Sequence, residues 1–129
     1  MSELSTILYV EDDPDIQAVA QMALELIGGF AVTVCSSGEQ ALLAAAASAP
    51  DLILLDVMMP TMDGPTTLAE LRATPGLAGI PVIFVTAKVQ TTEVEHYKSL
   101  GAVDVIAKPF DPMTLSDAVR TIWTRAVSS

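Results

Sequence analysis

Apolar residues in this chain gather in five short runs, separated by longer stretches in which they recur at helical spacing. Runs this short are typical of buried strands. The sequence therefore predicts strands over residues 6–10, 30–35, 52–55, 80–85 and 103–107. Several of these runs are apolar throughout rather than alternating, which indicates strands that are covered on both faces of a parallel sheet.

The stretches between the strands carry the start and stop signals of helices. Pro14 suits a first helical position with Asp13 as N-cap, and Gly28-Gly29 ends that helix. Its apolar positions at helical spacing are Ile16, Val19, Ala20, Ala23, Leu26 and Ile27. Further helices are predicted from a capping box at 37–40 to a stop before Pro50, over 65–73, over 92–100, and from a cap at Asp111-Pro112 to near Ala126, with Leu115, Ala118, Val119, Ile122 and Trp123 facing inward. Strands that alternate with helices predict a doubly wound α/β fold.

Composition and charge narrow the class of protein. A length of 129 residues fits a single domain, and we expect it to span 1–129 with no output domain attached. No apolar run approaches the ~18 residues of a membrane span, and the start lacks the basic region of a signal peptide. The single cysteine, Cys35, fits a reducing compartment, so we expect a cytoplasmic protein with no membrane partner. A net charge of −10 with six Lys and Arg argues against binding nucleic acid through its phosphates.

Polar residues follow four of the predicted strands directly. Glu11-Asp12-Asp13 follow the first strand, Asp56 the third, Thr86 the fourth and Lys108 the fifth. Each has an ordinary structural explanation when taken singly, such as a helix cap or a loop residue. In an open parallel sheet, however, ligands bind at the carboxyl ends of the strands, which meet at one edge. Together these residues predict a site there.

The residue types at this edge indicate the chemistry. Crowded carboxylates raise one another's pKa unless a cation lies among them. Oxygen ligands without His or Cys point to a hard ion, and Mg²⁺ commonly combines one or two protein carboxylates with waters and phosphate oxygens. A lysine and a hydroxyl add the positive charge and the donor that a phosphoryl group needs. We therefore predict a site for a phosphoryl group, a divalent ion and an aspartate nucleophile.

Four segments of the chain carry a family resemblance in both order and spacing: Val10-Glu11-Asp12-Asp13-Pro14, Asp56-Val57-Met58-Met59-Pro60-Thr61-Met62-Asp63-Gly64, Val85-Thr86-Ala87 and Lys108-Pro109-Phe110. The chain resembles the receiver domain of two-component response regulators, in particular the single-domain, chemotaxis-regulator-like type. The resemblance covers the whole chain. It implies a flavodoxin-like (βα)5 fold with strand order 2-1-3-4-5.

The resemblance also implies a metal site. It makes Asp56 the phosphoacceptor, with Asp12 and Asp56 as direct ligands of Mg²⁺, or of Mn²⁺ as a possible substitute. The main-chain carbonyl of Met58 is the third protein ligand, and Glu11 acts through water in the second coordination shell.

Further residues are implied to bind the phosphoryl group. Thr86 donates its hydroxyl and moves with the signal, Ala87 leaves room beside it, and Lys108 pairs with the phosphoryl oxygens. The Lys108–Pro109 peptide bond is expected to be cis. The donor histidine belongs to a partner, either a histidine kinase or a histidine phosphotransfer protein, and a further, unidentified protein receives the signal.

The chain departs from the family pattern at Val105, where many receivers carry Tyr or Phe. We hypothesise that output uses another part of the face made by the fourth helix, fifth strand and fifth helix. Val105 belongs to this predicted output face, and Tyr97, Phe110 or Trp123 are the candidates for the aromatic role. Met58 and Lys88 occupy positions that tune hydrolysis of the phosphoryl group in the family. Apolar Met58 is predicted to slow it.

Two alternatives remain open. One is a Mg²⁺-dependent phosphatase or phosphotransferase that uses Asp56 as nucleophile; haloacid-dehalogenase-type enzymes place a second acid where this chain has Met58. The other is a receiver-like module that binds partners without phosphorylation.

Overall fold

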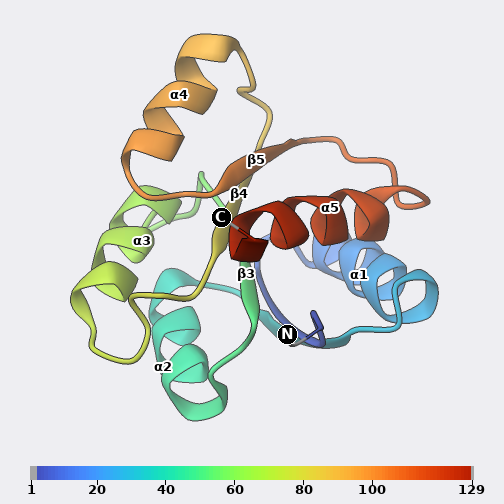
Figure 1. The fold of residues 1–129 in the computed structure, drawn as a ribbon, viewed down its shortest axis with the longest axis horizontal. Coiled ribbons are helices and arrows are strands. Elements are labelled where there is room, and N and C mark those ends of the chain that lie inside the picture. Colours follow the sequence, from blue (N-terminus) through green and yellow to red (C-terminus); the bar gives the residue numbers. More distant parts are fainter. Residues whose placement is uncertain (1–2, 129) are drawn as a thin grey trace.

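The computed structural model describes residues 3–128 and has a parallel sheet between two layers of helices (Figure 1). Its five strands are β1 (Thr6–Val10), β2 (Ala31–Cys35), β3 (Leu52–Asp56), β4 (Val82–Thr86) and β5 (Asp104–Ala107). They pair in the order β2-β1-β3-β4-β5, so the strand order that the resemblance implied is confirmed. The elements that flank the sheet are α1 (Pro14–Met22), η1 (Ala23–Ile27), α2 (Gly38–Ser48), α3 (Gly64–Ala73), α4 (Thr91–Ser99) and α5 (Leu115–Ser128).

The register aligns the carboxyl ends of the strands. Val10 pairs with Cys35 on one side and with Leu55 on the other. The Glu11 N–H donates to the Cys35 carbonyl at 3.0 Å, so the pairing of β1 with β2 continues one residue past the strand. The next side chains along the chain therefore emerge at one edge of the sheet.

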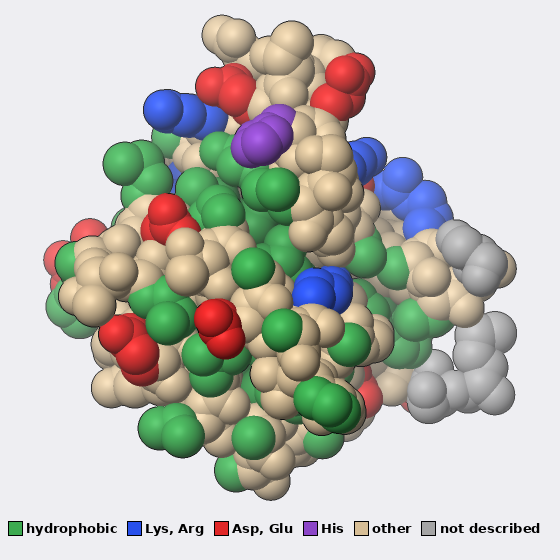
Figure 2. Space-filling model, turned by 90° about the vertical axis from the view of Figure 1, so that its left-hand side faces the viewer, with side chains coloured by type: hydrophobic (Ala, Val, Ile, Leu, Met, Phe, Trp, Pro, Cys, Tyr) green, Lys and Arg blue, Asp and Glu red, His purple; other side chains and the backbone are tan. Residues whose placement is uncertain are grey.

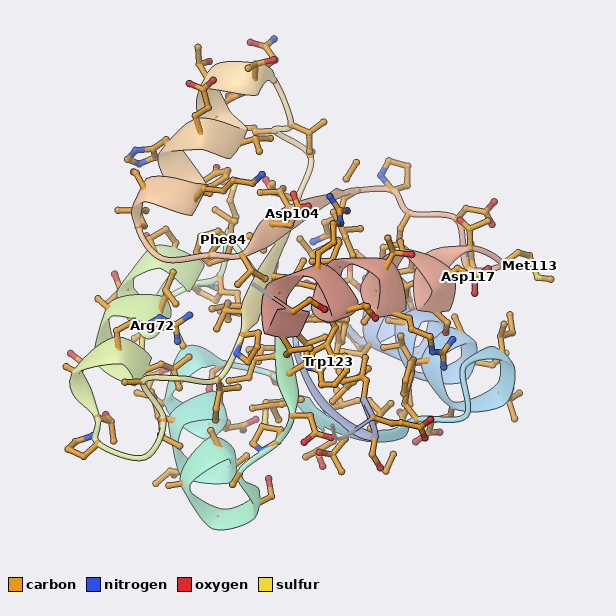
Figure 3. The ribbon with its side chains drawn as sticks, in the orientation of Figure 1. Arg72, Phe84, Asp104, Met113, Asp117 and Trp123 are labelled. Atoms are coloured by element: carbon orange, nitrogen blue, oxygen red, sulfur yellow. The ribbon has the colours of Figure 1, made fainter. Side chains whose placement is uncertain are left out.

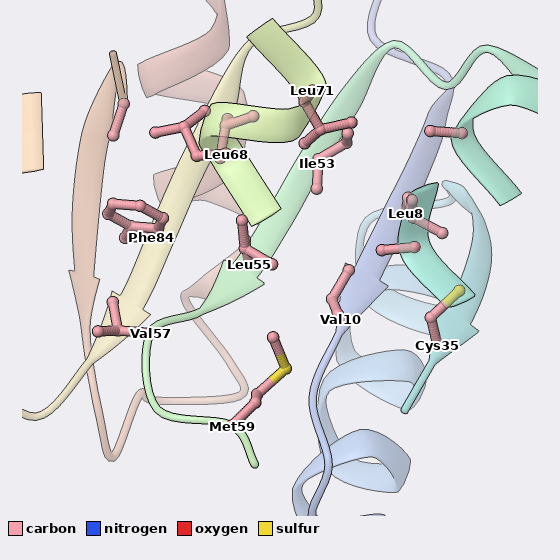
Figure 4. Close-up of a cluster of buried hydrophobic side chains, with 14 of the residues drawn as sticks. Leu8, Val10, Cys35, Ile53, Leu55, Val57, Met59, Leu68, Leu71 and Phe84 are labelled. Carbon is pink, nitrogen blue, oxygen red and sulfur yellow. The ribbon is translucent and has the colours of Figure 1, made fainter. Parts of the chain in front are cut away.

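The core has two parts, one on each face of the sheet. Leu8 and Val10 of β1 point to the face covered by α2, α3 and α4, where Leu68 and Leu71 of α3 join the cluster shown in Figure 4. Ile7, Tyr9 and their neighbours point to the face covered by α1 and α5. Every residue of β3 and β4 is buried, as expected for strands with helices on both sides.

Side-chain caps fix several helix starts. Asp13 caps α1 by accepting from the Asp15 and Ile16 amides, as predicted. Ser37 caps α2 through the Gln40 amide at 3.1 Å, and Asp63 caps α3 through the Thr66 amide at 2.9 Å. The caps hold the loops that leave the site edge of the sheet in fixed directions.

The apolar positions predicted at helical spacing in the first helix are not all buried. Val19 is 43% exposed. At the end of the helix Leu26 and Ile27 are 79% and 49% exposed, whereas Leu24 is fully buried. The cause is η1, a π-helical segment in which the Gly28 N–H donates to the Ala23 carbonyl at 3.3 Å. The wider turn shifts the apolar stripe along the helix. The buried Ser116 hydroxyl of α5 donates to the same Ala23 carbonyl at 3.0 Å and ties this segment to α5.

The last helix begins later than predicted. Asp111 caps a separate turn, because its Oδ1 accepts from the Met113 amide at 2.9 Å and its carbonyl accepts from the amides of Thr114 and Leu115. Regular helix starts at Leu115. β4 likewise starts at Val82, after Pro81, which has no N–H to give to the sheet.

On the face made by α2, α3 and α4, acidic and hydrophobic side chains are interspersed (Figure 2). Among the helices of residues 3–128, none combines the length and the hydrophobicity that crossing a bilayer requires.

Candidate functional site

Three charged side chains meet at the carboxyl edge of the sheet. Asp56 ends β3 and is 3% exposed, and Glu11 follows β1 and is 1% exposed. The Lys108 ammonium lies 3.0 Å from Asp56 Oδ1 and 2.8 Å from Glu11 Oε1. The structure thus brings together groups from the first, third and fifth strands. The Lys108–Pro109 bond that follows is cis, as the resemblance implied.

A group of carboxylates suited to a metal ion lies at the same place. Glu11, Asp12 and Asp56 each offer an oxygen atom within 4.8 Å of the others. Asp12 is exposed to solvent, while the other two are buried. The donor set contains oxygen and neither nitrogen nor sulfur, so it fits a hard divalent ion such as Mg²⁺ or Mn²⁺. This agrees with the expected cofactor.

Burial sets the electrostatics of these groups. Loss of solvent raises the pKa of Glu11 to about 7, although the close Lys108 ammonium and the hydrogen bond from the Asp13 amide oppose the rise and the Asp56 charge adds to it. Burial of Lys108 acts to lower its pKa, but its close contacts with Glu11 and Asp56 and the charges of these two acids outweigh burial, so the pKa is raised. Lys108 is therefore held as a cation between two buried acids.

The loop after Asp56 is fixed by a close backbone approach. The Gly64 amide donates to the Val57 carbonyl at 2.9 Å. A Cβ at Gly64 would lie 2.5 Å from the Asp56 carbonyl oxygen and 2.9 Å from the Val57 Cα. Only glycine permits this contact, which closes the loop that carries Met58 against the end of β3.

Thr86 ends the neighbouring strand and is 4% exposed. Its Oγ1 accepts a hydrogen bond from the Lys88 amide at 3.1 Å, so its own hydrogen can be donated elsewhere. The Lys108 amide donates to the Thr86 carbonyl at 2.9 Å and fixes the spacing of the two residues. Ala87 and Lys88 follow on the exposed rim.

A cavity of about 580 Å³ opens beside Asp56. Its wall combines site residues with part of α1 and with the loop after β5: Asp15, Ile16, Val19, Asp56, Met58, Thr86, Ala87, Lys88, Lys108, Pro109 and Phe110. The three α1 residues, Asp15, Ile16 and Val19, were not among the site residues predicted from the sequence. Their place in the first turns after the Glu11-Asp12-Asp13 cluster is the signal that could have identified them.

The family model of the response regulator receiver domain matches residues 7–120. The chain belongs to this family. The receiver identified from four short segments is thereby confirmed across most of the chain.

Curated relatives extend the likeness. The receiver is 38% identical over 125 residues to the transcriptional regulatory protein CseB of Streptomyces avermitilis, covering 97% of this chain and 52% of that protein. It is 40% identical over 114 residues to the DNA-binding response regulator MtrA of Mycolicibacterium smegmatis, covering 88% and 48%. The receiver spans about half the length of these relatives. Because one of them is named as DNA-binding, the sequence-based exclusion of nucleic acid gains no support from them.

Solved structures agree on the fold. Chemotaxis protein CheY4 of Vibrio cholerae matches with a TM-score of 0.84 at 26% identity, over 92% of this chain and 98% of that one. The N-terminal domain of a response regulator receiver protein from Methanoculleus marisnigri matches with a TM-score of 0.74 at 38% identity, over 92% and 96%. The flavodoxin-like fold predicted for the receiver is confirmed.

The predicted output residues lie in different environments. Tyr97 is 8% exposed, and its ring packs edge-on against Phe84 at 5.2 Å between centroids. Val105 is half-buried against the same cluster. Trp123 is 8% exposed on the side of α5 that faces the sheet (Figure 3). Phe110 is half-buried and lines the cavity instead. The output role of all four stays a prediction.

Proposed function

We propose that this receiver takes a phosphoryl group onto Asp56 from a phosphohistidine of a histidine kinase or phosphotransfer protein, and that the modification switches its binding to a further protein. One observation carries the proposal. The Asp56 carboxylate is held by Lys108 at 3.0 Å beside two further acids, at the wall of a cavity large enough to admit a donor side chain.

The acids would bind the ion in two ways. Asp12 and Asp56, with the Met58 main-chain carbonyl, would hold Mg²⁺ directly, and Glu11 would act through water, as the family resemblance implies. When bound, Mg²⁺ supplies positive charge that offsets the negative charge of the phosphoryl oxygens. The site without it holds more buried negative charge than Lys108 alone can balance, which favours occupation by a cation.

Residues of this chain then position the transfer. A carboxylate oxygen of Asp56 attacks phosphorus, the P–N bond to the donor histidine breaks, and that histidine keeps the electron pair and takes up a proton. Lys108 pairs with the transferred oxygens, and the Thr86 hydroxyl donates to another of them. Ala87 presents only a methyl group, which leaves space for the tetrahedral phosphoryl group.

The alternatives lack support from specific residues. A haloacid-dehalogenase-type phosphatase places an acid that protonates the leaving group two residues after its nucleophile, and this chain has Met58 there. Receiver domains are signalling modules, so we infer that the chain turns over no substrate of its own beyond adding and losing this phosphoryl group. A module that works without phosphorylation would not need a buried Asp56 paired with Lys108. We also propose a cytoplasmic location, where a free cysteine such as Cys35 stays reduced.

Mass spectrometry after incubation with Mg²⁺ and acetyl phosphate tests the proposal. The wild-type chain is expected to gain one phosphoryl group, and Asp56→Asn none. Asp63→Asn is the matched control, because it lies in the same loop and asparagine caps a helix as well as aspartate does. Continuous release of phosphate from a small substrate would favour the phosphatase. Absence of labelling in the wild-type chain would favour the phosphorylation-independent module.

A further inference from the structure

Two buried polar atoms next to the site lack an aligned hydrogen bond. Over residues 3–128 they are the only such side-chain atoms: Tyr9 Oη and Glu11 Oε1, each on a residue that is 1% exposed. Glu11 Oε2 accepts from the Asp13 amide at 3.2 Å. Glu11 Oε1 lies 2.8 Å from Lys108 Nζ, as an ion pair without the alignment of a hydrogen bond. An unpartnered hydroxyl in a core calls for an explanation.

The two residues share one face of the sheet. They are two positions apart along β1, and the Glu11 amide continues the strand pairing by donating to the Cys35 carbonyl at 3.0 Å. Side chains two apart on a strand leave the same face. Burial raises the pKa of the Tyr9 phenol, and the negative charges of Glu11 and Asp56 raise it further. The hydroxyl is therefore a donor that lies within the electrostatic reach of both acids.

Lys108 gains new partners after phosphorylation. In the unmodified chain its ammonium contacts Glu11 at 2.8 Å and Asp56 at 3.0 Å. Under the proposed function, on which this inference rests, the phosphoryl oxygens on Asp56 take over Lys108. Glu11 Oε1 then loses the ammonium while it stays buried, and a further donor beside the ion-bound water of the proposed function would stabilise it.

We propose that Tyr9 is a positioning residue for the phosphorylated state: its hydroxyl donates a hydrogen bond to Glu11 Oε1 when Lys108 turns to the phosphoryl group. The exchange keeps the Glu11 carboxylate oriented toward the ion. It also gives the Tyr9 hydroxyl a hydrogen-bond partner in the phosphorylated state only, so Tyr9 favours that state over the free one.

The exchange predicts opposite effects of Tyr9→Phe in the two states. In the free chain the substitution removes a hydroxyl that has no partner, so the melting temperature should be unchanged or higher. With Mg²⁺ and beryllofluoride, a stable stand-in for the phosphoryl group, the substitution removes a hydrogen bond. The apparent affinity for beryllofluoride should fall about fivefold, the equivalent of one ordinary hydrogen bond.

Thermal unfolding and beryllofluoride titration of the wild-type chain and Tyr9→Phe test this. Ser116→Ala is the matched control, because it deletes another buried hydroxyl, one whose partner is the Ala23 carbonyl at 3.0 Å. This control should lower the melting temperature equally in both states. In a Glu11→Ala background, Tyr9→Phe should no longer change the affinity, because the acceptor is gone.

These measurements distinguish a failure of the proposed role of Tyr9 from a failure of the proposed function. If Tyr9→Phe changes the melting temperature equally in both states, or leaves the beryllofluoride affinity unchanged, the role of Tyr9 is overturned while the proposed function stands. A wild-type chain that shows no response to beryllofluoride with Mg²⁺ would overturn the proposed function, and the role of Tyr9 with it.

Discussion

The Lys108 ammonium donates a hydrogen bond to Asp56 Oδ1 at 3.0 Å, from the end of β5 across β4 to the end of β3. The same ammonium lies 2.8 Å from Glu11 Oε1. One cation is therefore shared by two buried carboxylates in the free receiver. A bound ion or a phosphoryl group would redistribute these contacts.

Replacing Lys108 should destabilise the metal-free chain. In Lys108→Met two carboxylates that are 1% and 3% exposed lose their cation, and breaking a buried ion pair costs about 3 kcal/mol. Mg²⁺ should restore part of the loss, since it neutralises the same acids. Urea unfolding in EDTA and in Mg²⁺ measures both effects. Lys88→Met, on the exposed rim, should change stability by less than about 0.5 kcal/mol. A Lys108→Met chain as stable as the wild type in EDTA would contradict the prediction.

Because of Glu11, the free energy of unfolding of the metal-free receiver should increase as the pH is lowered from about 8. Its pKa is about 7 in the fold against an ordinary 4.5, so between these values the folded chain binds a proton that the unfolded chain releases. This contribution to stability is complete below the ordinary value and is lost as pH rises through about 7. Glu11→Gln removes the titration and should flatten this part of the curve. Urea unfolding in EDTA at about pH 5.5 and about pH 8 checks it.

The matched control for Glu11 is Glu70→Gln, which changes an exposed glutamate on α3. It should keep the wild-type difference in unfolding free energy between the two pH values. If Glu11→Gln keeps that difference too, burial does not raise the Glu11 pKa.

The sequence predicts the fold well because its signals are local. Apolar runs such as 52–55 mark buried strands, and Asp13 and Ser37 mark helix starts that the structure confirms. The convergence of Asp56 and Lys108 follows from the rule that parallel strands end at one edge. These local signals therefore identify the edge of the sheet where the site lies.

What the sequence does not predict depends on contacts between distant segments. The π-helical η1 forms where Ser116 of α5 bonds to the Ala23 carbonyl, a partner 93 residues away. The ion pair of Lys108 with Glu11 and the unpartnered hydroxyl of Tyr9 need side-chain positions that no local pattern encodes. These contacts determine where the π-helical segment forms and which acids share the Lys108 ammonium, and only the three-dimensional structure shows them.

Gly64 should be required for both stability and metal binding. Gly64→Ala places a Cβ 2.5 Å from the Asp56 carbonyl oxygen, so the loop must shift and the chain should lose about 1–3 kcal/mol. The same shift moves the Met58 carbonyl, so Mg²⁺ affinity should fall. Urea unfolding and calorimetric Mg²⁺ titration measure the two effects. Gly79→Ala is the control, because its Cβ would meet no atom within 4 Å. Equal behaviour of the two variants would show that the close approach at Gly64 is unimportant.

Met58 should slow the loss of the phosphoryl group from Asp56. Its side chain is 70% exposed and lines the cavity beside Asp56, where an apolar group cannot orient an attacking water. Met58→Asn adds an amide that can hold that water. Because one such hydrogen bond is worth about 1 kcal/mol, dephosphorylation should speed up about fivefold. Radiolabel decay from the purified phosphorylated chain in Mg²⁺ gives the rate. Met113→Asn, 69% exposed and outside the cavity lining, controls for the loss of a surface methionine and should leave the rate unchanged. An unaltered rate in Met58→Asn would mean that water reaches the phosphoryl group by a path that this side chain does not touch.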